Sequence, residues 1–277
     1  MNFISFYPAF ITFQSPGEVL FKLGGIDVHW YGIFIAAGFL IALGACLYAA
    51  KQEGFDLNEI IDLSTLLLVG TIIFARLYYV IFDWDYFHAH LAEIFMLWKG
   101  GLSIHGVIIG GVIILFLYTK FKKVSLFKYT DLFACALPLG QSIGRWGNFF
   151  NSEAFGIPTT LPLRVYIPLE RRPVEFLEYN YFHPTFFYES LWNLVVFFIL
   201  FFVLRHKFKA INGVTTFSYL ILYSAGRFII ESLRTDNIYS ILNLHIAQFI
   251  SLILIITGII GLFIVFLNKR SLREKKV

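Results

Sequence analysis

Residues 140–156 read Gly140-Gln-Ser-Ile-Gly-Arg145-Trp-Gly-Asn148-Phe-Phe-Asn151-Ser-Glu153-Ala-Phe-Gly156. The stretch begins inside an apolar run, yet within nine residues it carries a guanidinium, two carboxamides and a carboxylate. Removing such groups from water is costly unless a partner or a ligand compensates them. The stretch therefore indicates either a functional site at the end of a membrane span or a buried ion pair between helices.

The composition is that of an integral membrane protein. Of the 277 residues, 58% are hydrophobic and 14% are charged, whereas soluble domains have about 25% charged residues. The mean hydropathy is +0.74. A net charge of +4 is too small to indicate binding of nucleic acid. Cys46 and Cys135 both lie in apolar runs and are expected to be small packing residues.

Seven segments meet or approach the length of about 20 mostly apolar residues that a membrane span requires. The sequence thus predicts an all-α membrane protein with seven transmembrane helices in a single domain, 1–277. The first twelve residues, interrupted by Pro8, are expected to form a short interfacial helix rather than a cleaved signal peptide. The predicted spans are residues 26–50, 59–82, 102–119, 126–147, 188–204, 214–232 and 244–267.

Lys and Arg predict the orientation, because cytoplasmic loops carry an excess of them. With the N-terminus outside, the inner segments contain thirteen of the 22 basic residues and the outer segments six. We therefore expect an outer N-terminus and a cytoplasmic C-terminus. Most polar residues of the spans then lie in the outer half of the bilayer, as expected for one site rather than scattered ion pairs. They are Tyr31, Arg76, His105, Arg145, Asn148, Tyr188, Glu189, Arg227, Glu231, Arg234 and His245.

The longest connection, residues 148–187, is expected to be an extracytoplasmic loop region between the fourth and fifth spans. It contains five prolines, so neither a continuous helix nor a central strand is expected there. Its many aromatic residues indicate an ordered segment. Two interpretations stay open: the segment presents a partner to the membrane site, or it is a solvated lid with no contact role.

Arg145 and Arg227 each lie on an apolar helix near the outer face. A guanidinium stays charged and matches the geometry of a phosphate, so the pair suggests capture of a phospholipid head group. The alternative is that each arginine pairs with a carboxylate. Arg227 and Glu231 have the i, i+4 spacing for such a pair, whereas Arg145 has no acidic partner so close in sequence.

Two histidines accompany the arginines. His105 stands beside Gly106 and Gly110, whose spacing is typical of close helix packing, and is either a base or a hydrogen-bonding bridge. His183 precedes Pro184, a residue common at helix starts. His183 and the nearby Glu189 are expected to hold the loop in place.

Residues 144–156 form the most specific of several motifs that run in one order along the chain. The others are Trp30-Tyr31-Gly32, residues 101–111 around His105, His183-Pro184-Thr185 with Tyr188-Glu189, and Tyr223 followed by Gly226-Arg227-Phe228-Ile-Ile-Glu231 and Arg234-Thr-Asp236. Together they resemble the bacterial prolipoprotein diacylglyceryl transferase family. Two positions depart from the family pattern: its His-Gly-Gly is His105-Gly106-Val107 here, and its Asn-Gly-Glu is Asn151-Ser152-Glu153.

The resemblance implies transfer of the diacylglyceryl group of phosphatidylglycerol to the lipobox cysteine of a prolipoprotein signal peptide, with release of glycerol phosphate. It places the protein in the bacterial cytoplasmic membrane, with the site facing the outer leaflet. The implied catalytic residues are His105, Arg145, Arg227 and Tyr223, and the implied ligands of phosphatidylglycerol are Arg145, Arg227, Asn148, Glu153 and Tyr31. Glu231, Arg234, Tyr188, Glu189 and His183 are expected to support the site. No metal or other cofactor is expected, because the arginines supply positive charge.

A transporter or channel is the competing class, because charged residues at span ends can also line a path. Such a protein is expected to have two related halves and polar groups through the full membrane depth. The sequence has no evident halves, and its polar residues gather on one side, which favours the transferase.

Overall fold

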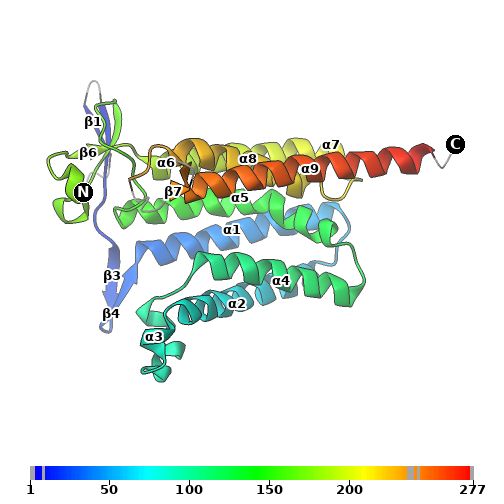
Figure 1. Ribbon diagram of the computed structural model, residues 1–277, viewed down its shortest axis with the longest axis horizontal. Helices are drawn as coiled ribbons and strands as arrows, with labels where there is room; N and C mark the ends of the chain where they lie inside the picture. Colours follow the sequence, from blue (N-terminus) through cyan, green and yellow to red (C-terminus); the bar gives the residue numbers. More distant parts are fainter. Residues whose placement is uncertain (1–3, 8–9, 236–239, 242–243, 275–277) are drawn as a thin grey trace. The chain divides into compact units, whose positions relative to one another are not determined.

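The computed structural model describes residues 4–7, 10–235, 240–241 and 244–274; Asp236 of the last motif lies outside these ranges. The chain is mostly helical and divides into two compact units (Figure 1). Unit 1 comprises residues 1–45 and 133–277, and unit 2 comprises residues 46–132.

Helices cover all seven predicted spans. They are α1 (Trp30–Gln52), α2 (Leu57–Phe82), α4 (Ile104–Lys122), α5 (Leu126–Phe150), α6 (Thr185–Phe198), α8 (Val214–Glu231) and α9 (Ile246–Glu274). The short π-helical segment η5 (Ile199–Leu204) joins α6 to α7 (Arg205–Phe208). The helix starts at residues 30 and 246 fall later than predicted, because the strands β4 (Ile26–His29) and β8 (Leu244–His245) precede them.

Five helical segments among the described residues are long and apolar enough to cross a membrane: α1, α2, α4, the α6–α7 segment and α9. Large apolar side chains such as Ile256 and Phe263 on α9 are exposed, as expected for helices surrounded by lipid. The protein is therefore a multi-pass membrane protein. Helices α5 and α8, which carry the polar groups of residues 141–148 and 223–231, are not among these five segments. The seven-span count therefore remains a prediction.

Within unit 2, α2 and α4 pack closely. A methyl group on Gly106 would collide with the backbone of Phe74 and Ala75, and one on Gly110 would lie 2.6 Å from Cβ of Phe74. The predicted close-packing role of the two glycines is confirmed. The α2–α4 connection contains α3 (Trp84–Phe87) and two short 3₁₀ helices, η1 (Leu91–Phe95) and η2 (Leu97–Lys99).

Arg76 organises this connection instead of joining a cluster of charges. Its guanidinium is buried and donates to the backbone oxygens of Glu93 (2.5 Å), Ile94 (2.9 Å), Gly100 (2.7 Å) and Gly101 (3.0 Å). Four carbonyl acceptors satisfy a buried guanidinium without a carboxylate.

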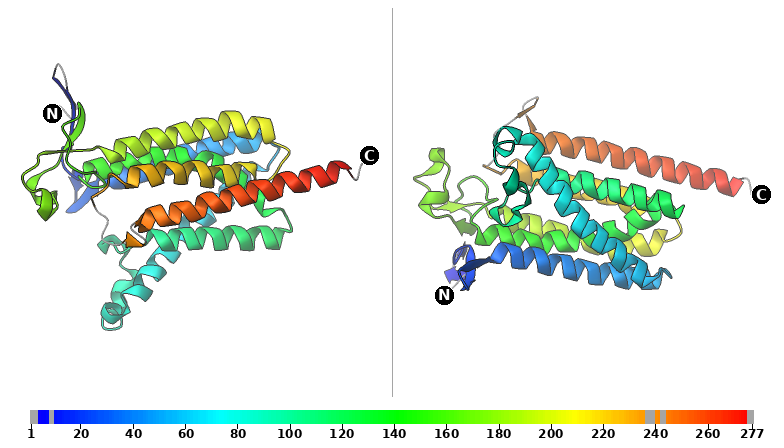
Figure 2. Two further views of the ribbon diagram at one scale, coloured as in Figure 1. Left: turned by 45° about the horizontal axis from the view of Figure 1, so that its top comes forward. Right: turned by 90° about the horizontal axis from the view of Figure 1, so that it is seen from below.

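Within unit 1, helices α5, α6, α8 and α9 run side by side (Figure 2). Helices α1 and α5 approach at Gly38 and Gly140, where a methyl group on Gly38 would lie 2.8 Å from the oxygen of Gly140. Cys46 and Cys135 are both buried, as expected for packing residues. The surroundings of Cys135 are not purely apolar, because its Sγ accepts a hydrogen bond from Nη1 of Arg205 (3.5 Å).

A sheet joins the N-terminal residues to the loop region between α5 and α6. The strands β1 (Ile4–Tyr7), β2 (Phe10–Gln14), β5 (Leu163–Tyr166) and β6 (Tyr181–Phe182) form a sheet in the order β1-β2-β5-β6. The parallel pair β2–β5 places Phe13 opposite Val165, and the other two pairs are antiparallel. Two smaller hairpins pair β3 (Val19–Leu23) with β4 and β7 (Ser240–Ile241) with β8.

This sheet corrects two predictions. Residues 4–7 and 10–14 form strands and not an interfacial helix; the rest of the first twelve residues lies outside the described ranges. In addition, β5 is an interior strand of a segment in which no central strand was expected. The two errors have separate causes. The partner of β2 is distant in sequence, and the prolines of residues 148–187 lie outside β5 and β6, where they interrupt no hydrogen bond of those strands. The loop region also contains η3 (Leu169–Arg171) and η4 (Val174–Phe176).

An aromatic core holds the sheet against the helices of unit 1. Phe13, Phe149, Phe155, Phe182 and Phe186 are buried together. These residues come from β2, the end of α5, the loop region, β6 and the start of α6, so burial of their rings orders the whole region. The prediction that aromatic residues order residues 148–187 is confirmed.

Candidate functional site

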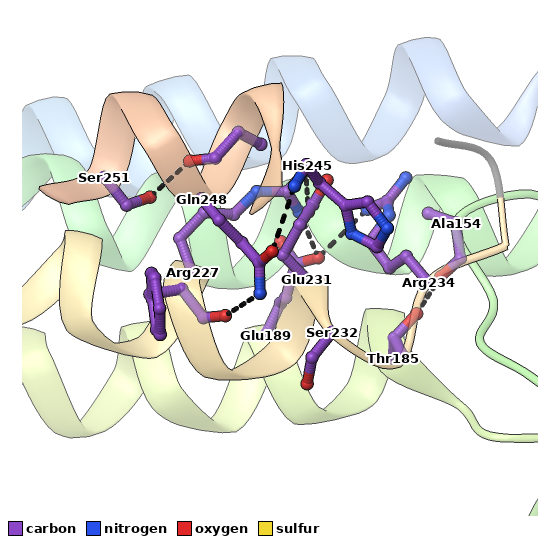
Figure 3. A network of polar contacts seen from close by, with 12 residues as sticks. Ala154, Thr185, Glu189, Arg227, Glu231, Ser232, Arg234, His245, Gln248 and Ser251 are labelled. Carbon is purple, nitrogen blue, oxygen red and sulfur yellow. Dashed lines mark hydrogen bonds and ion pairs between the residues drawn. The ribbon is translucent and has the colours of Figure 1, made fainter. Parts of the chain in front are cut away.

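The carboxylate of Glu189 lies at the centre of an arginine cluster in unit 1 (Figure 3). Its Oε2 is 2.5 Å from Nη2 of Arg145, and its Oε1 is 2.7 Å from Nη1 of Arg227 and 3.0 Å from Nη1 of Arg234. Arg227 also contacts Glu231, with Nη2 2.5 Å from Oε2. The alternative in which Arg145 and Arg227 pair with carboxylates is therefore realised, and the predicted i, i+4 pair is confirmed.

Exposure differs between the two kinds of group in the cluster. The side chains of Glu189 and Glu231 are 4% and 1% exposed, whereas those of Arg145 and Arg227 are 23% and 19% exposed. A buried carboxylate needs a counter-ion, and the arginines provide it. Arg145 and Arg227 thus form the accessible part of the cluster, which can accept an anion, whereas the side chain of Arg234 is only 9% exposed.

Hydrogen bonds set the register of the helices that carry the cluster. Ser142 Oγ donates to the backbone oxygen of Ser190 (2.8 Å), and Ser190 Oγ donates to that of Ser142 (2.9 Å). This reciprocal pair joins α5 to α6 less than one turn from Arg145 and immediately after Glu189. It therefore positions Arg145 against Glu189.

Two glycines make room for aromatic rings at the site. A methyl group on Gly226 would overlap the indole of Trp192, whose Nε1 donates to the oxygen of Leu222 (2.9 Å). A methyl group on Gly147 would lie 2.8 Å from Cδ2 of Tyr31. The glycines of these motifs are explained by close approach of side chains rather than by backbone freedom.

A third carboxylate, that of Glu153, lies just beyond the end of α5. Its Oε1 accepts hydrogen bonds from Nδ2 of Asn148 (2.7 Å) and of Asn151 (3.3 Å). Tyr31 lies within electrostatic range of both Glu153 and Arg145. Ser152 has φ +50°, a left-handed conformation that favours glycine. The predicted residues Tyr31, Asn148, Glu153 and Arg145 are thus neighbours.

Backbone hydrogen bonds attach the loop region to the end of α8. Ile157 N donates to the oxygen of Leu233 (2.7 Å), and Gly156 N donates to that of His183 (2.9 Å). Nδ1 of His183 lies 3.3 Å from the hydroxyl of Tyr188, and burial lowers the pKa of His183. The contact with Tyr188 agrees with the expected role of His183 in holding the loop. Glu189, which was expected to share that role, contacts the arginines of the cluster instead.

Sequence reasoning did not select two groups beside the cluster. Gln248, on α9, is buried and donates from Nε2 to the oxygen of Phe228 (3.3 Å), while its Oε1 accepts from the backbone N of His245 (3.1 Å) (Figure 3). Gln141, one turn before Arg145, donates to the hydroxyl of Tyr219 (2.9 Å). Both glutamines are polar residues within apolar helices, and this feature of the sequence could have identified them as candidate site residues.

Tyr223 and His105 are the two predicted catalytic residues outside this set of contacts. The ring of Tyr223 stacks on that of Tyr219 at 5.5 Å in unit 1. His105 belongs to unit 2, where its ring stacks on Tyr78 at 5.6 Å. Among the described residues, no group of three His, Cys, Asp or Glu side chains is placed to hold a metal ion.

Comparison with known proteins identifies the family. The family model for prolipoprotein diacylglyceryl transferase matches residues 18–264. The chain belongs to the prolipoprotein diacylglyceryl transferase family. The proteins called phosphatidylglycerol–prolipoprotein diacylglyceryl transferase in Synechococcus elongatus and Acaryochloris marina are 44% and 46% identical to it. These matches cover 95% and 96% of this chain and 92% and 96% of the relatives. The Thermotoga petrophila protein of that name is 43% identical over 99% of this chain and 94% of the relative.

The two departures from the pattern of the diacylglyceryl transferase family differ in their structural consequences. In His105-Gly106-Val107, the close packing against α2 requires the glycine at 106, and this glycine is retained. In Asn151-Ser152-Glu153, the family glycine is replaced at a position with positive φ. The second departure therefore imposes backbone strain next to Glu153, and the first imposes none on the α2–α4 contact.

Proposed function

We propose that the protein transfers the diacylglyceryl group of phosphatidylglycerol to the thiol of a prolipoprotein cysteine. The observation that carries the proposal is the arginine cluster, in which Arg145 and Arg227 share a buried carboxylate while their own side chains stay partly exposed. Membership of the transferase family supports this chemistry over transport. The acceptor is the lipobox cysteine of a signal peptide.

The reaction requires a carbon–sulfur bond to replace a carbon–oxygen bond. The cysteine thiolate attacks the glycerol carbon that is esterified to phosphate, and the oxygen of that ester leaves with the phosphate. A phosphodiester with one negative charge thereby becomes a phosphate monoester, and a second negative charge develops on the departing oxygen. Arg145 and Arg227 stabilise this charge in a site with little water.

The thiol must lose its proton, because its ordinary pKa of about 8.5 leaves little thiolate at neutral pH. His105 is the proposed base. Tyr223 orients the lipid, and Tyr31, Asn148 and Glu153 bind the hydroxyl groups of its head group. Glu189, Glu231, Arg234, Tyr188 and His183 support the site through the contacts described above.

The proposed topology has seven transmembrane spans in a single membrane domain, with the N-terminus outside and the C-terminus in the cytoplasm. Residues 148–187 are then extracytoplasmic, and the site faces the outer leaflet of the cytoplasmic membrane. The excess of basic residues in the predicted inner segments supports this orientation. The attachment of the loop region to the end of α8 supports placing the arginine cluster on the same side of the membrane as that loop.

The test is a transfer assay with the purified full-length protein in detergent micelles that contain phosphatidylglycerol. A peptide with a lipobox cysteine should gain the mass of a diacylglyceryl group and resist hydroxylamine, as expected for a thioether. The same peptide with serine in place of cysteine should not react. A folded protein that leaves the cysteine peptide unmodified would contradict the proposal and favour the competing interpretation, a transporter or channel.

A further inference from the structure

The proposed reaction creates a difficulty for the arginine cluster. Positive charge that stabilises the developing phosphate monoester also retains that product after the reaction. The phosphodiester substrate carries one negative charge, whereas a phosphate monoester carries nearly two above its second pKa of about 6. A site built from arginines alone would therefore bind its product more tightly than its substrate.

We propose that Glu189 weakens the binding of the phosphate monoester selectively and thereby promotes product release. This inference rests on the proposed function. Glu189 is suited to the role because its two oxygens contact three guanidinium groups, those of Arg145, Arg227 and Arg234, at 2.5–3.0 Å. A phosphate that binds Arg145 and Arg227 together must compete with Glu189 for their N–H donors.

Burial makes this competition strong. Glu189 is 4% exposed, and in such surroundings water screens charges weakly. The carboxylate repels a bound phosphate in proportion to the charge of that phosphate, so a dianion is repelled about twice as strongly as a monoanion. Glu189 thus lowers the affinity for the monoester more than the affinity for the diester.

Glu231 provides a matched second position. Its Oε2 lies 2.5 Å from Nη2 of Arg227, on the other side of that guanidinium from Glu189. Each terminal nitrogen of Arg227 therefore has a carboxylate partner. Neutralising Glu231 adds the same charge to the cluster and leaves all three contacts of Glu189 in place.

A merely structural role of Glu189 makes a different prediction. If the carboxylate served only to hold the three arginines together, its loss would weaken the binding of both phosphates by a similar factor. The ratio of the two affinities separates these roles, because damage to the fold or partial inactivation cancels in that ratio.

The experiment measures binding of glycerol 1-phosphate and of its methyl ester to the purified full-length protein by equilibrium dialysis at pH 7.5. The methyl ester is a phosphodiester with one negative charge. In Glu189→Gln, the ratio of the two affinities should shift towards glycerol 1-phosphate by about tenfold. Glu231→Gln should shift the ratio of the two affinities in the same direction. If Glu189→Gln does not fold, the ratio measured for Glu231→Gln tests the inference.

Two controls test whether the change in the affinity ratio comes from the charge of Glu189 and from the second charge of the phosphate. Glu18→Gln removes an exposed carboxylate that pairs with Arg171 at 3.2 Å and should leave the ratio unchanged. At pH 5, where glycerol 1-phosphate is mainly a monoanion, the shift seen in Glu189→Gln should largely disappear. An unchanged ratio at pH 7.5 in the folded variants would overturn the inference, even if the wild-type protein modifies the lipobox peptide. Binding without any transfer activity would instead contradict the proposed function.

Discussion

The guanidinium of Arg145 and the carboxylate of Glu189 lie 2.5 Å apart, on α5 and α6 respectively. Because Glu189 also contacts Arg227 and Arg234, one carboxylate on α6 holds together positive charges from α5 and from the end of α8. The close grouping of these arginines depends on Glu189, since like charges at such distances repel one another.

Glu189→Ala should therefore destabilise the protein strongly. Loss of the buried partner leaves the arginines uncompensated, at a cost of about 3–5 kcal/mol. Thermal unfolding in detergent measures this effect, with Glu178→Ala on the exposed loop as the control. Equal midpoints for the two variants would show that the arginines are compensated in another way.

The glycines before the two arginines should respond differently to substitution. Gly226→Ala drives a methyl group into the indole of Trp192, whereas Gly144→Ala meets only Cδ1 of Ile35 at 3.4 Å. Overpacking of this kind costs about 1–3 kcal/mol, so Gly226→Ala should lower the unfolding midpoint and the transfer rate. Gly144→Ala should have a smaller effect on both. A larger effect of Gly144→Ala than of Gly226→Ala would contradict the close packing of Gly226 against Trp192.

Ser152→Gly should stabilise the protein or leave its stability unchanged. A non-glycine residue in the left-handed region costs about 1–2 kcal/mol, and the greater freedom of glycine in the unfolded chain offsets about 0.5–1 kcal/mol of the relief. Unfolding midpoints of the wild type and the variant measure the difference. A clear loss of stability would mean that the serine side chain makes a contribution larger than the strain.

Acidification should weaken the attachment of the loop region at His183. Burial lowers the pKa of His183 below its ordinary value of 6.5, so between the two pKa values the unfolded chain binds a proton that the folded chain does not. Stability is unaffected above the ordinary pKa and falls as the pH drops below it. Comparison of unfolding midpoints at pH 7.5 and 5.5 should show a smaller change in His183→Gln than in the wild type or in His206→Gln, a variant at an exposed position.

The helices were predictable from sequence because each is a long apolar run. The strands were not, because β2 and β5 are short and their pairing joins Phe13 to Val165 across most of the chain. No local pattern specifies such a partner.

The candidate site was predictable as a set of residues but not as a set of contacts. Arg145 and Glu189 were both selected because a charged group in an apolar helix is costly to remove from water and therefore indicates a site. That Glu189 joins three arginines follows only from the packing of α5, α6 and the end of α8. The role of Arg76 was equally hidden, since its partners are backbone oxygens and backbone acceptors have no sequence signature.

The most direct test of the account is the transfer rate of Arg145→Ala and Arg227→Ala in the lipobox-peptide assay. Arg171→Ala is the matched control, because Arg171 is an exposed arginine that pairs with Glu18, and such pairs contribute little to stability. We predict that both cluster variants, compared with the control at equal amounts of folded protein, are at least about 100-fold slower, as expected when a donor to a developing anion is removed. Transfer at the control rate by both folded variants would contradict the claim that these arginines stabilise the departing phosphate.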